Sequence, residues 1–290
     1  MKHEDLRCIY MGKQLYTVNS EDLDIIAPKK LNNRKSRSAL LLLHGFSSTP
    51  GVYRFLLPHI KDFYDSLIIP ALPGHVESIQ AFSQIKDSEL LQFAEQTCAS
   101  LVEKYQYVDV LGLSLGGLIG CHLSNKFDLR HLYLLAPALD LTLNITKTMW
   151  LIQFLQALGF RNIRSAAGNI YLSLAQEKVY QQMTVKRGFN LDEFKGGEIA
   201  YRQIPLAASL TILTLIKEFQ FIIPKCPTDL FLGAHDKVVN SQQVAKRFAN
   251  QAHIKTHWLP NSAHVLPLDN DIEVIIQSIK TNFQPLQSKK

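Results

Sequence analysis

The sequence predicts an α/β fold in which a mainly parallel sheet carries helices on both faces. Short apolar stretches alternate with longer amphipathic ones along most of the chain, as strands alternate with helices in such folds. Several apolar stretches end abruptly at glycine or proline, which is typical of buried strands. Right-handed crossovers between parallel strands then place helices on both sides of the sheet.

The chain is long enough for one large domain with an insertion. It has 290 residues, of which 47% are hydrophobic and 19% charged. This composition is typical of a globular protein and argues against disorder or a coiled coil.

The first half of the chain contains four of the expected strands. Ser38–Leu43 is wholly apolar after its first residue and stops at His44-Gly45, so it predicts a buried strand. Residues 89–105 carry apolar side chains at helical spacing. The expected strands here are 38–43, 67–69, 107–111 and 131–135, and the expected helices are 53–61, 89–105 and 115–126.

The second half continues the alternation after one long interruption. The expected strands are 228–232 and 254–259, and the expected helices are 204–216, 242–250 and 271–283. Residues 1–37 match no clear pattern and have room for one or two edge strands.

About ninety residues of helical character separate strand 131–135 from strand 228–232, which is too long for a simple crossover. We interpret residues 140–225 as a small helical cap, inserted into a core formed by 1–139 and 226–290. The cap is expected over the carboxyl ends of the strands, where open α/β sheets bind ligands.

The charge of the chain argues against a nucleic-acid partner, and its cysteines argue against a metal site. The chain has 31 Lys and Arg against 25 Asp and Glu, a net charge of +6. The one dense basic stretch, residues 29–37, is interpreted as a solvated loop rather than a nucleic-acid or membrane contact. The four cysteines form no C-x-x-C pair, so free buried thiols are expected and no metal site.

No secretory signal is recognised in the first twenty residues. The longest nearly apolar run, Ile204–Ile216, is shorter than the roughly 20 residues of a membrane span. We therefore expect a cytoplasmic protein without a transmembrane segment, although signal-independent export and transient membrane-surface contact stay open.

The residues Gly112-Leu113-Ser114-Leu115-Gly116 form a G-x-S-x-G pattern between an expected strand and an expected helix. This is the pattern of a nucleophile elbow, in which a sharp turn exposes a serine at a helix N-terminus. Ser114 is therefore the candidate nucleophile.

A serine nucleophile needs a base, and the base needs an orienting acid. Asp236 and His264 each follow an expected strand at its carboxyl end, in the order Ser, Asp, His.

An oxyanion hole would need two N–H donors, and the backbone of Leu115 and of Phe46 is placed to supply them. The competing acids and histidines that we weighed and ranked lower are Asp109, Asp140, Asp229, His44, His235, His253 and His257.

Together these motifs resemble the α/β-hydrolase superfamily, and most closely its bacterial carboxylesterase and monoacylglycerol-lipase branch. The resemblance covers 38–136 and 226–283, with only a loose match in the cap. It rests on His44-Gly45-Phe46, Pro73-Gly74-His75, Gly112 to Gly117, Gly233 to Val239 and Ala263-His264-Val265. One departure stands out: where the family often has Pro-Gly-x-Gly-x-Ser, this chain has Val76 in place of the second glycine and keeps Ser78.

The resemblance implies an α/β-hydrolase fold with the cap after the sixth-strand position, and ester hydrolysis through an acyl-enzyme on Ser114 without a metal or organic cofactor. Esters of short to medium acyl chains, which can include monoacylglycerols, are the expected substrates. We expect the acyl pocket among the apolar residues Trp150, Leu206, Leu210 and Leu213, although each could instead pack inside the cap. A thioesterase, a carbon–carbon hydrolase and, less favoured, a non-catalytic ligand-binding protein remain alternatives, because the fold does not fix the substrate.

Overall fold

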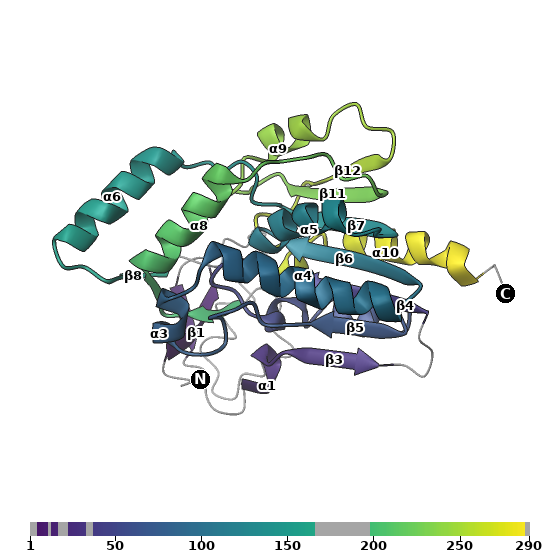
Figure 1. Ribbon diagram of the computed structural model, residues 1–290, viewed down its shortest axis with the longest axis horizontal. Helices are drawn as coiled ribbons and strands as arrows, with labels where there is room; N and C mark the ends of the chain where they lie inside the picture. The colour runs from purple at the N-terminus through teal and green to yellow at the C-terminus, as the bar shows by residue number, and fades with distance from the viewer. Residues whose placement is uncertain (1–4, 11–12, 17–22, 33–36, 166–197, 288–290) are drawn as a thin grey trace.

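The computed structural model describes residues 5–10, 13–16, 23–32, 37–165 and 198–287 (Figure 1). Its centre is a seven-stranded sheet in the order β12-β11-β7-β6-β4-β5-β3. All neighbouring strands run parallel except β3, which pairs antiparallel with β5. The strands of this sheet are β3 (Lys29–Asn32), β4 (Ser38–Leu43), β5 (Ser66–Ile69), β6 (Tyr107–Leu113), β7 (His131–Leu135), β11 (Thr228–Gly233) and β12 (Ile254–Leu259).

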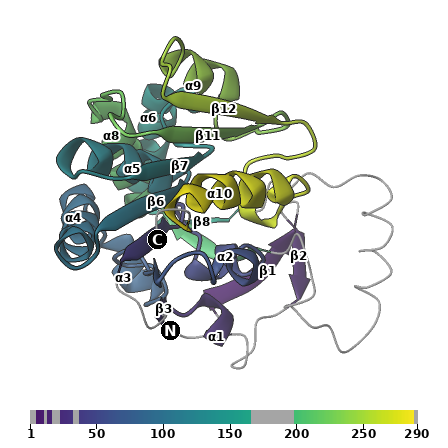
Figure 2. The ribbon, with the colours of Figure 1, turned by 90° about the vertical axis from the view of Figure 1, so that its right-hand side faces the viewer.

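Helices cover both faces of the sheet, as the sequence predicts. They are α1 (Leu23–Ile26), α2 (Leu57–Ile60), α3 (Ile79–Ser83), α4 (Asp87–Lys104), α5 (Leu115–Lys126), α9 (Ser241–Arg247) and α10 (Ile272–Gln287), with short 3-10 helices at Pro50–Tyr53 and Leu266–Leu268. Figure 2 shows α2 and α10 on the side of the sheet opposite to α4 and α5.

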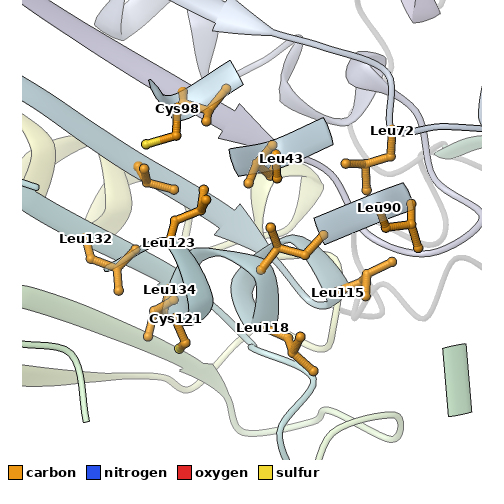
Figure 3. Close-up of a cluster of buried hydrophobic side chains, with 14 of the residues drawn as sticks. Leu43, Leu72, Leu90, Cys98, Leu115, Leu118, Cys121, Leu123, Leu132 and Leu134 are labelled. Carbon is orange, nitrogen blue, oxygen red and sulfur yellow. The ribbon is translucent and has the colours of Figure 1, made fainter. Parts of the chain in front are cut away.

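Alternate residues of β4 build the two hydrophobic cores. Leu41 and Leu43 belong to the cluster that contains the buried side chains of α4 and α5. Leu40 and Leu42 belong to the cluster on the other face, with α2 and α10. Figure 3 shows the first cluster, where α5 packs over β7. Because both faces of β4 are buried, it reads as a continuous apolar run rather than an alternating one.

The N-terminal residues form strands in two places. Lys29–Asn32 is the edge strand β3 and not the loop that we expected, although its side chains are largely exposed, as a solvated segment requires. The strands β1 (Leu6–Tyr10) and β2 (Lys13–Tyr16) lie outside the main sheet. They form a second, three-stranded sheet in which β1 pairs with β9 (Glu198–Tyr201).

The cap contains more than helices. The helix α6 (Ile145–Ala157) packs against α8 (Leu206–Glu218), and the short strands β8 (Asn162–Arg164) and β10 (Gln203–Pro205) pair between them. Strands of three residues are too short to give a periodic signal, so the sequence predicted only the helical part. The division into core and cap remains our interpretation, and the β1–β9 pairing ties the two parts together.

One expected helix, 53–61, is broken. The chain forms a 3-10 turn over Pro50–Tyr53 and then the single turn α2. Pro58 has no backbone N–H to donate, so an uninterrupted helix through this position is disfavoured.

Candidate active site

Ser114 lies in a strained turn between β6 and α5. Its φ of 54° and ψ of −111° place a non-glycine residue in a backbone region that is rarely occupied. The turn is held by hydrogen bonds from Ser114 N–H to Leu135 O and from Ala138 N–H to Ser114 O. The geometry also explains the flanking glycines, because a Cβ on Gly112 would lie 2.1 Å from the carbonyl oxygen of Gly116.

The predicted base and acid are joined directly. His264 Nδ1 lies 2.8 Å from Asp236 Oδ2 and donates to it. The other carboxylate oxygen, Oδ1, accepts the backbone N–H groups of Val238 and Val239 at 2.8 and 2.9 Å. The Asp236 side chain is fully buried, so its orientation is fixed and its charge is little screened.

The imidazole of His264 is tuned by its surroundings. Burial lowers its pKa, but the charge and hydrogen bond of Asp236, together with the charge of Glu198, raise the pKa by more than burial lowers it. The pKa of His264 therefore lies above the ordinary value of an imidazole. With Nδ1–H committed to Asp236, Nε2 is the ring atom left to exchange a proton with a reacting group.

Ser114 and His264 line the same cavity of about 400 Å³. No hydrogen bond joins their side chains in the part of the chain that the structure describes. Such contacts are often long without a substrate and tighten when one binds. The structure thus brings the three predicted residues to one edge of the sheet.

The competing residues are engaged elsewhere. Asp140 pairs with Arg247, and Asp109 accepts from Tyr64 and Arg130. Asp229 lies at the opposite end of its strand, where it bonds His131 and His257. His257 is therefore half-buried and paired, not a plain surface residue. His235 and His253 are exposed.

The loop after β4 approaches the serine closely. A Cβ on Gly45 would lie 3.2 Å from Ser114 Cβ, so this contact favours glycine. Neither Phe46 N–H nor Leu115 N–H donates a hydrogen bond among the described residues. Two unpaired donors beside a nucleophile are what an oxyanion hole requires.

Two buried histidines, His44 and His75, hold this loop. His44 Nε2 accepts from Leu72 N–H at 3.0 Å, and His75 Nε2 accepts from Ser47 N–H at 3.3 Å. Burial, with a contribution from the neighbouring His75, lowers the pKa of His44 to about 3. Burial lowers the pKa of His75 to about 4. Both rings therefore stay neutral near pH 7 and keep an acceptor nitrogen.

Glu198 is a site residue that the sequence analysis missed. It is only 5% exposed, and it lines the cavity with Ser114 and His264. Burial raises its pKa, against the opposing effects of the Ser48 hydroxyl and the charges of His264 and Arg54. Its strand β9 is fixed by β1 and by a hydrogen bond from Thr49 Oγ1 to Ile199 O.

The remaining cavity walls are mainly apolar, and they differ from the acyl pocket that we expected. The apolar residues that line the cavity are Phe46, Leu113, Leu143, Ile163, Ile204, Val238 and Val265. Of the expected residues, Leu206 and Leu213 pack with Ile152 inside the cap, and Leu210 packs against that cluster. Trp150 is 66% exposed. None of these four residues lines the cavity. Helical apolar spacing alone does not distinguish a cap's own core from a pocket wall.

Among the described residues, no group of three or more His, Cys, Asp or Glu side chains is placed to hold a metal ion. No described helix is long and apolar enough to cross a membrane.

Comparison with known proteins places the fold. Residues 40–277 match the model of the alpha/beta hydrolase family. A structure from work on the metagenome-derived lipolytic enzymes LipS and LipT is 20% identical, with 90% of this chain and 98% of that chain covered and a TM-score of 0.71.

Two monoacylglycerol lipase structures are also similar. The enzyme from Paleococcus ferrophilus is 14% identical, with 89% and 98% covered and a TM-score of 0.63. A soluble variant of monoglyceride lipase from Saccharomyces cerevisiae is 12% identical, with 88% and 90% covered and a TM-score of 0.64. At these identities the likeness concerns the fold. No curated protein matches the chain in sequence.

Proposed function

Since the chain belongs to the alpha/beta hydrolase family, we propose that it is a serine esterase whose substrates are esters of apolar acyl chains, with monoacylglycerols as the favoured class. One observation carries this proposal. Ser114, in its strained turn, shares a cavity with Phe46 and with His264, whose ring is hydrogen-bonded to Asp236. Among the described residues, the N–H groups of Phe46 and Leu115 donate no hydrogen bond.

The proposed reaction proceeds in two halves. Ser114 Oγ attacks the acyl carbonyl while His264 Nε2 takes its proton, and the N–H groups of Phe46 and Leu115 stabilise the oxyanion. Collapse of this intermediate expels the alcohol, which receives the proton from His264. Water, deprotonated by His264, then attacks the acyl-serine; the bond from the acyl carbon to Ser114 Oγ breaks, Oγ takes the proton back from His264, and the acid is released. Asp236 fixes the ring and stabilises its charged form throughout.

The polar residues of the cavity support glycerol as the alcohol that leaves in the reaction. Glu198 and Ser48 line the cavity among mainly apolar residues, so they can bond free hydroxyls of a glycerol leaving group.

The cytoplasmic location expected from the sequence is part of the same proposal. It is supported by Cys98, Cys121 and Cys226, which are buried as free thiols.

Hydrolysis of p-nitrophenyl esters from C2 to C12 tests the proposal, with the wild type and Ser114→Ala measured side by side. We expect an active wild type and a loss of at least about a thousandfold in kcat for the variant. Ser100→Ala, which changes an exposed serine of α4, is the matched control and should retain activity. A wild type that is inactive on every ester, or an active Ser114→Ala, would contradict the proposal; thioesters and carbon–carbon substrates assayed in parallel would then identify the alternative chemistry.

A further inference from the structure

The strand β9 contacts the candidate active site through more than one of its residues. Glu198, at its start, lines the cavity, and the backbone oxygen of Ile199 accepts the Thr49 hydroxyl. Tyr201, at its end, is fully buried and is not among the residues that line the cavity. Its hydroxyl donates instead to the backbone oxygen of Gly74 at 3.1 Å. This hydrogen bond joins β9 to the loop that follows β5.

The ring of Tyr201 belongs to an aromatic cluster that reaches the loop after β4. It stacks on the ring of Phe82 in α3, with centroids 4.5 Å apart and planes inclined by 10°. Phe82 in turn contacts the rings of His75 and Phe46, with centroids 4.7 and 5.4 Å away. Tyr201, Phe82 and His75 are buried. Because a close-packed interior transmits small displacements, a shift of Tyr201 would be felt at the loop after β4.

His75 connects this cluster to the backbone beside the serine. It follows Gly74 directly, and its Nε2 accepts the N–H of Ser47 at 3.3 Å. Ser47 has a φ of 58°, which a non-glycine residue adopts only where the surrounding structure holds it. The direction of the N–H of Phe46, the preceding residue, therefore depends on how this turn is held.

We propose that Tyr201 is a positioning residue, whose hydrogen bond to Gly74 sets the direction of the Phe46 N–H group in the oxyanion hole. The route runs through His75 and its hydrogen bond with Ser47. Burial raises the pKa of the Tyr201 hydroxyl, so the group keeps the proton that it donates. The part played by Phe46 rests on the proposed function, whereas the hold of Tyr201 on the loop does not.

Tyr201→Phe tests the proposal, because it removes the hydroxyl and keeps the stacked ring. We expect kcat for a p-nitrophenyl ester to fall about tenfold with little change in KM. An oxyanion donor acts in the transition state, and complete loss of one costs about 100- to 1000-fold in kcat, so a misdirected donor should cost less.

The matched control is Tyr64→Phe, which removes another buried tyrosine hydroxyl. That hydroxyl donates to Asp109 in the first half of β6, whereas Ser114 follows the last residue of the same strand. Tyr64→Phe should therefore lower the free energy of unfolding in urea and keep the wild-type kcat. The comparison separates a positioning role of Tyr201 from a contribution to stability alone.

An alkyl trifluoromethyl ketone reports on the oxyanion hole directly. Ser114 Oγ adds to its carbonyl carbon, the Oγ proton passes to His264 Nε2, and the carbonyl oxygen becomes the bound oxyanion. No group leaves, so the inhibition constant measures the stability of a charged tetrahedral adduct. It should rise in Tyr201→Phe by the factor by which kcat/KM falls, and stay unchanged in Tyr64→Phe.

The route through His75 predicts effects that are not additive. His75→Phe removes the acceptor of the Ser47 N–H and keeps an aromatic ring. The double variant with Tyr201→Phe should lose little more kcat than His75→Phe alone, because both changes act on the same turn. Losses that multiply would overturn the proposal, since Tyr201 and His75 would then act separately.

Hydrogen exchange at the Ser47 N–H tests the hold on the loop without any substrate. This amide is buried and bonded to His75. It should be protected in the wild type and in Tyr64→Phe, and should exchange about tenfold faster in Tyr201→Phe. Unchanged exchange in Tyr201→Phe would overturn the proposal, whatever the enzyme hydrolyses.

The two readouts separate this proposal from the proposed function. An active wild type whose kcat survives Tyr201→Phe would overturn the positioning role and leave the esterase standing. A wild type that is inactive on every ester, with an amide of Ser47 that exchanges faster in Tyr201→Phe, would support the hold on the loop and contradict only the esterase.

Discussion

The imidazole of His264 is influenced by two carboxylates that come from different parts of the chain. Asp236 is hydrogen-bonded to Nδ1, while Glu198 acts through its charge from the cavity wall. Both stabilise the imidazolium, and both therefore raise the pH below which His264, the proposed base, stays protonated.

Removing the charge of Glu198 should consequently lower the pKa of His264. In Glu198→Gln we expect the acidic limb of the pH profile of kcat/KM to move to lower pH, since this limb reports the base of the free enzyme. We also expect kcat/KM for a monoacylglycerol to fall about tenfold more than that for a p-nitrophenyl ester, which has no hydroxyl to bond.

The matched control for this change is Glu89→Gln, which alters an exposed acid of α4. Its profile should coincide with that of the wild type. If the Glu198→Gln limb stayed in place, Glu198 would have no electrostatic role at His264.

The sequence predicts those residues of the candidate site whose position is marked by a strand end or by a motif that constrains the backbone. Ser114, Asp236 and His264 stand out because each follows a strand and because glycines must flank the serine turn. Glu198 has no such motif, and its only signal is one acid at the start of the apolar stretch Glu198–Tyr201. Its place in the cavity depends on pairing with β1, which no local pattern indicates.

At the scale of an element, the loop after β5 shows what the departure from the family pattern means. Val76, which stands where the family often has glycine, has a φ of +59°. Such a backbone is strained for a β-branched residue. Two interactions hold the ends of the loop in place: Ser78 caps α3, and His75 N–H donates a hydrogen bond to Leu72 O.

The strain at Val76 predicts an unusual order of stability. Val76→Gly should be about 1 kcal/mol more stable than Val76→Ala, because only glycine adopts this φ without penalty. The same pair at Val102, inside α4, should show the reverse order, since glycine weakens a helix interior. Urea unfolding of the four variants measures this, and alanine proving better at both positions would mean that residue 76 is not strained.

Elements could be predicted where burial on both faces or helical spacing extends over several residues. The parallel strands of the main sheet and α4, α5 and α10 satisfy this condition. The strands β8 and β10 have three residues each, and the paired strands β1 and β9 are far apart in the sequence. Long-range pairing of this kind leaves little trace in local sequence.

At the scale of the whole molecule, a polar cluster closes the end of the sheet remote from Ser114. Asp229 of β11 bonds His131 of β7, His257 of β12 and Asn282 of α10. Burial raises the pKa of Asp229, but these hydrogen bonds outweigh burial and place its pKa below the ordinary value of the carboxyl. One side chain thus joins three strands to the last helix.

This cluster should contribute stability that depends on pH. Because the pKa of Asp229 is lower in the folded chain, its contribution is full above the unfolded pKa of about 4 and is lost as the pH falls below it. Asp229→Asn should therefore lower the free energy of unfolding by about 2 kcal/mol at pH 7, with a smaller difference at pH 3.

Urea unfolding at the two pH values provides the measurement. Asp128→Asn, a change of an exposed acid, should have little effect at either pH. An Asp229→Asn deficit that is equal at pH 7 and pH 3 would show that the charge of Asp229 is not what stabilises the fold.

The β1–β9 pairing has a consequence for synthesis on the ribosome. Ile9 pairs with Glu198, so about 190 residues must be translated before β1 meets its partner. At roughly 5–20 residues per second this takes about 10–40 s. In the later part of that interval the nascent chain already contains the elbow around Ser114, while Glu198 and His264, the proposed base, have still to be made.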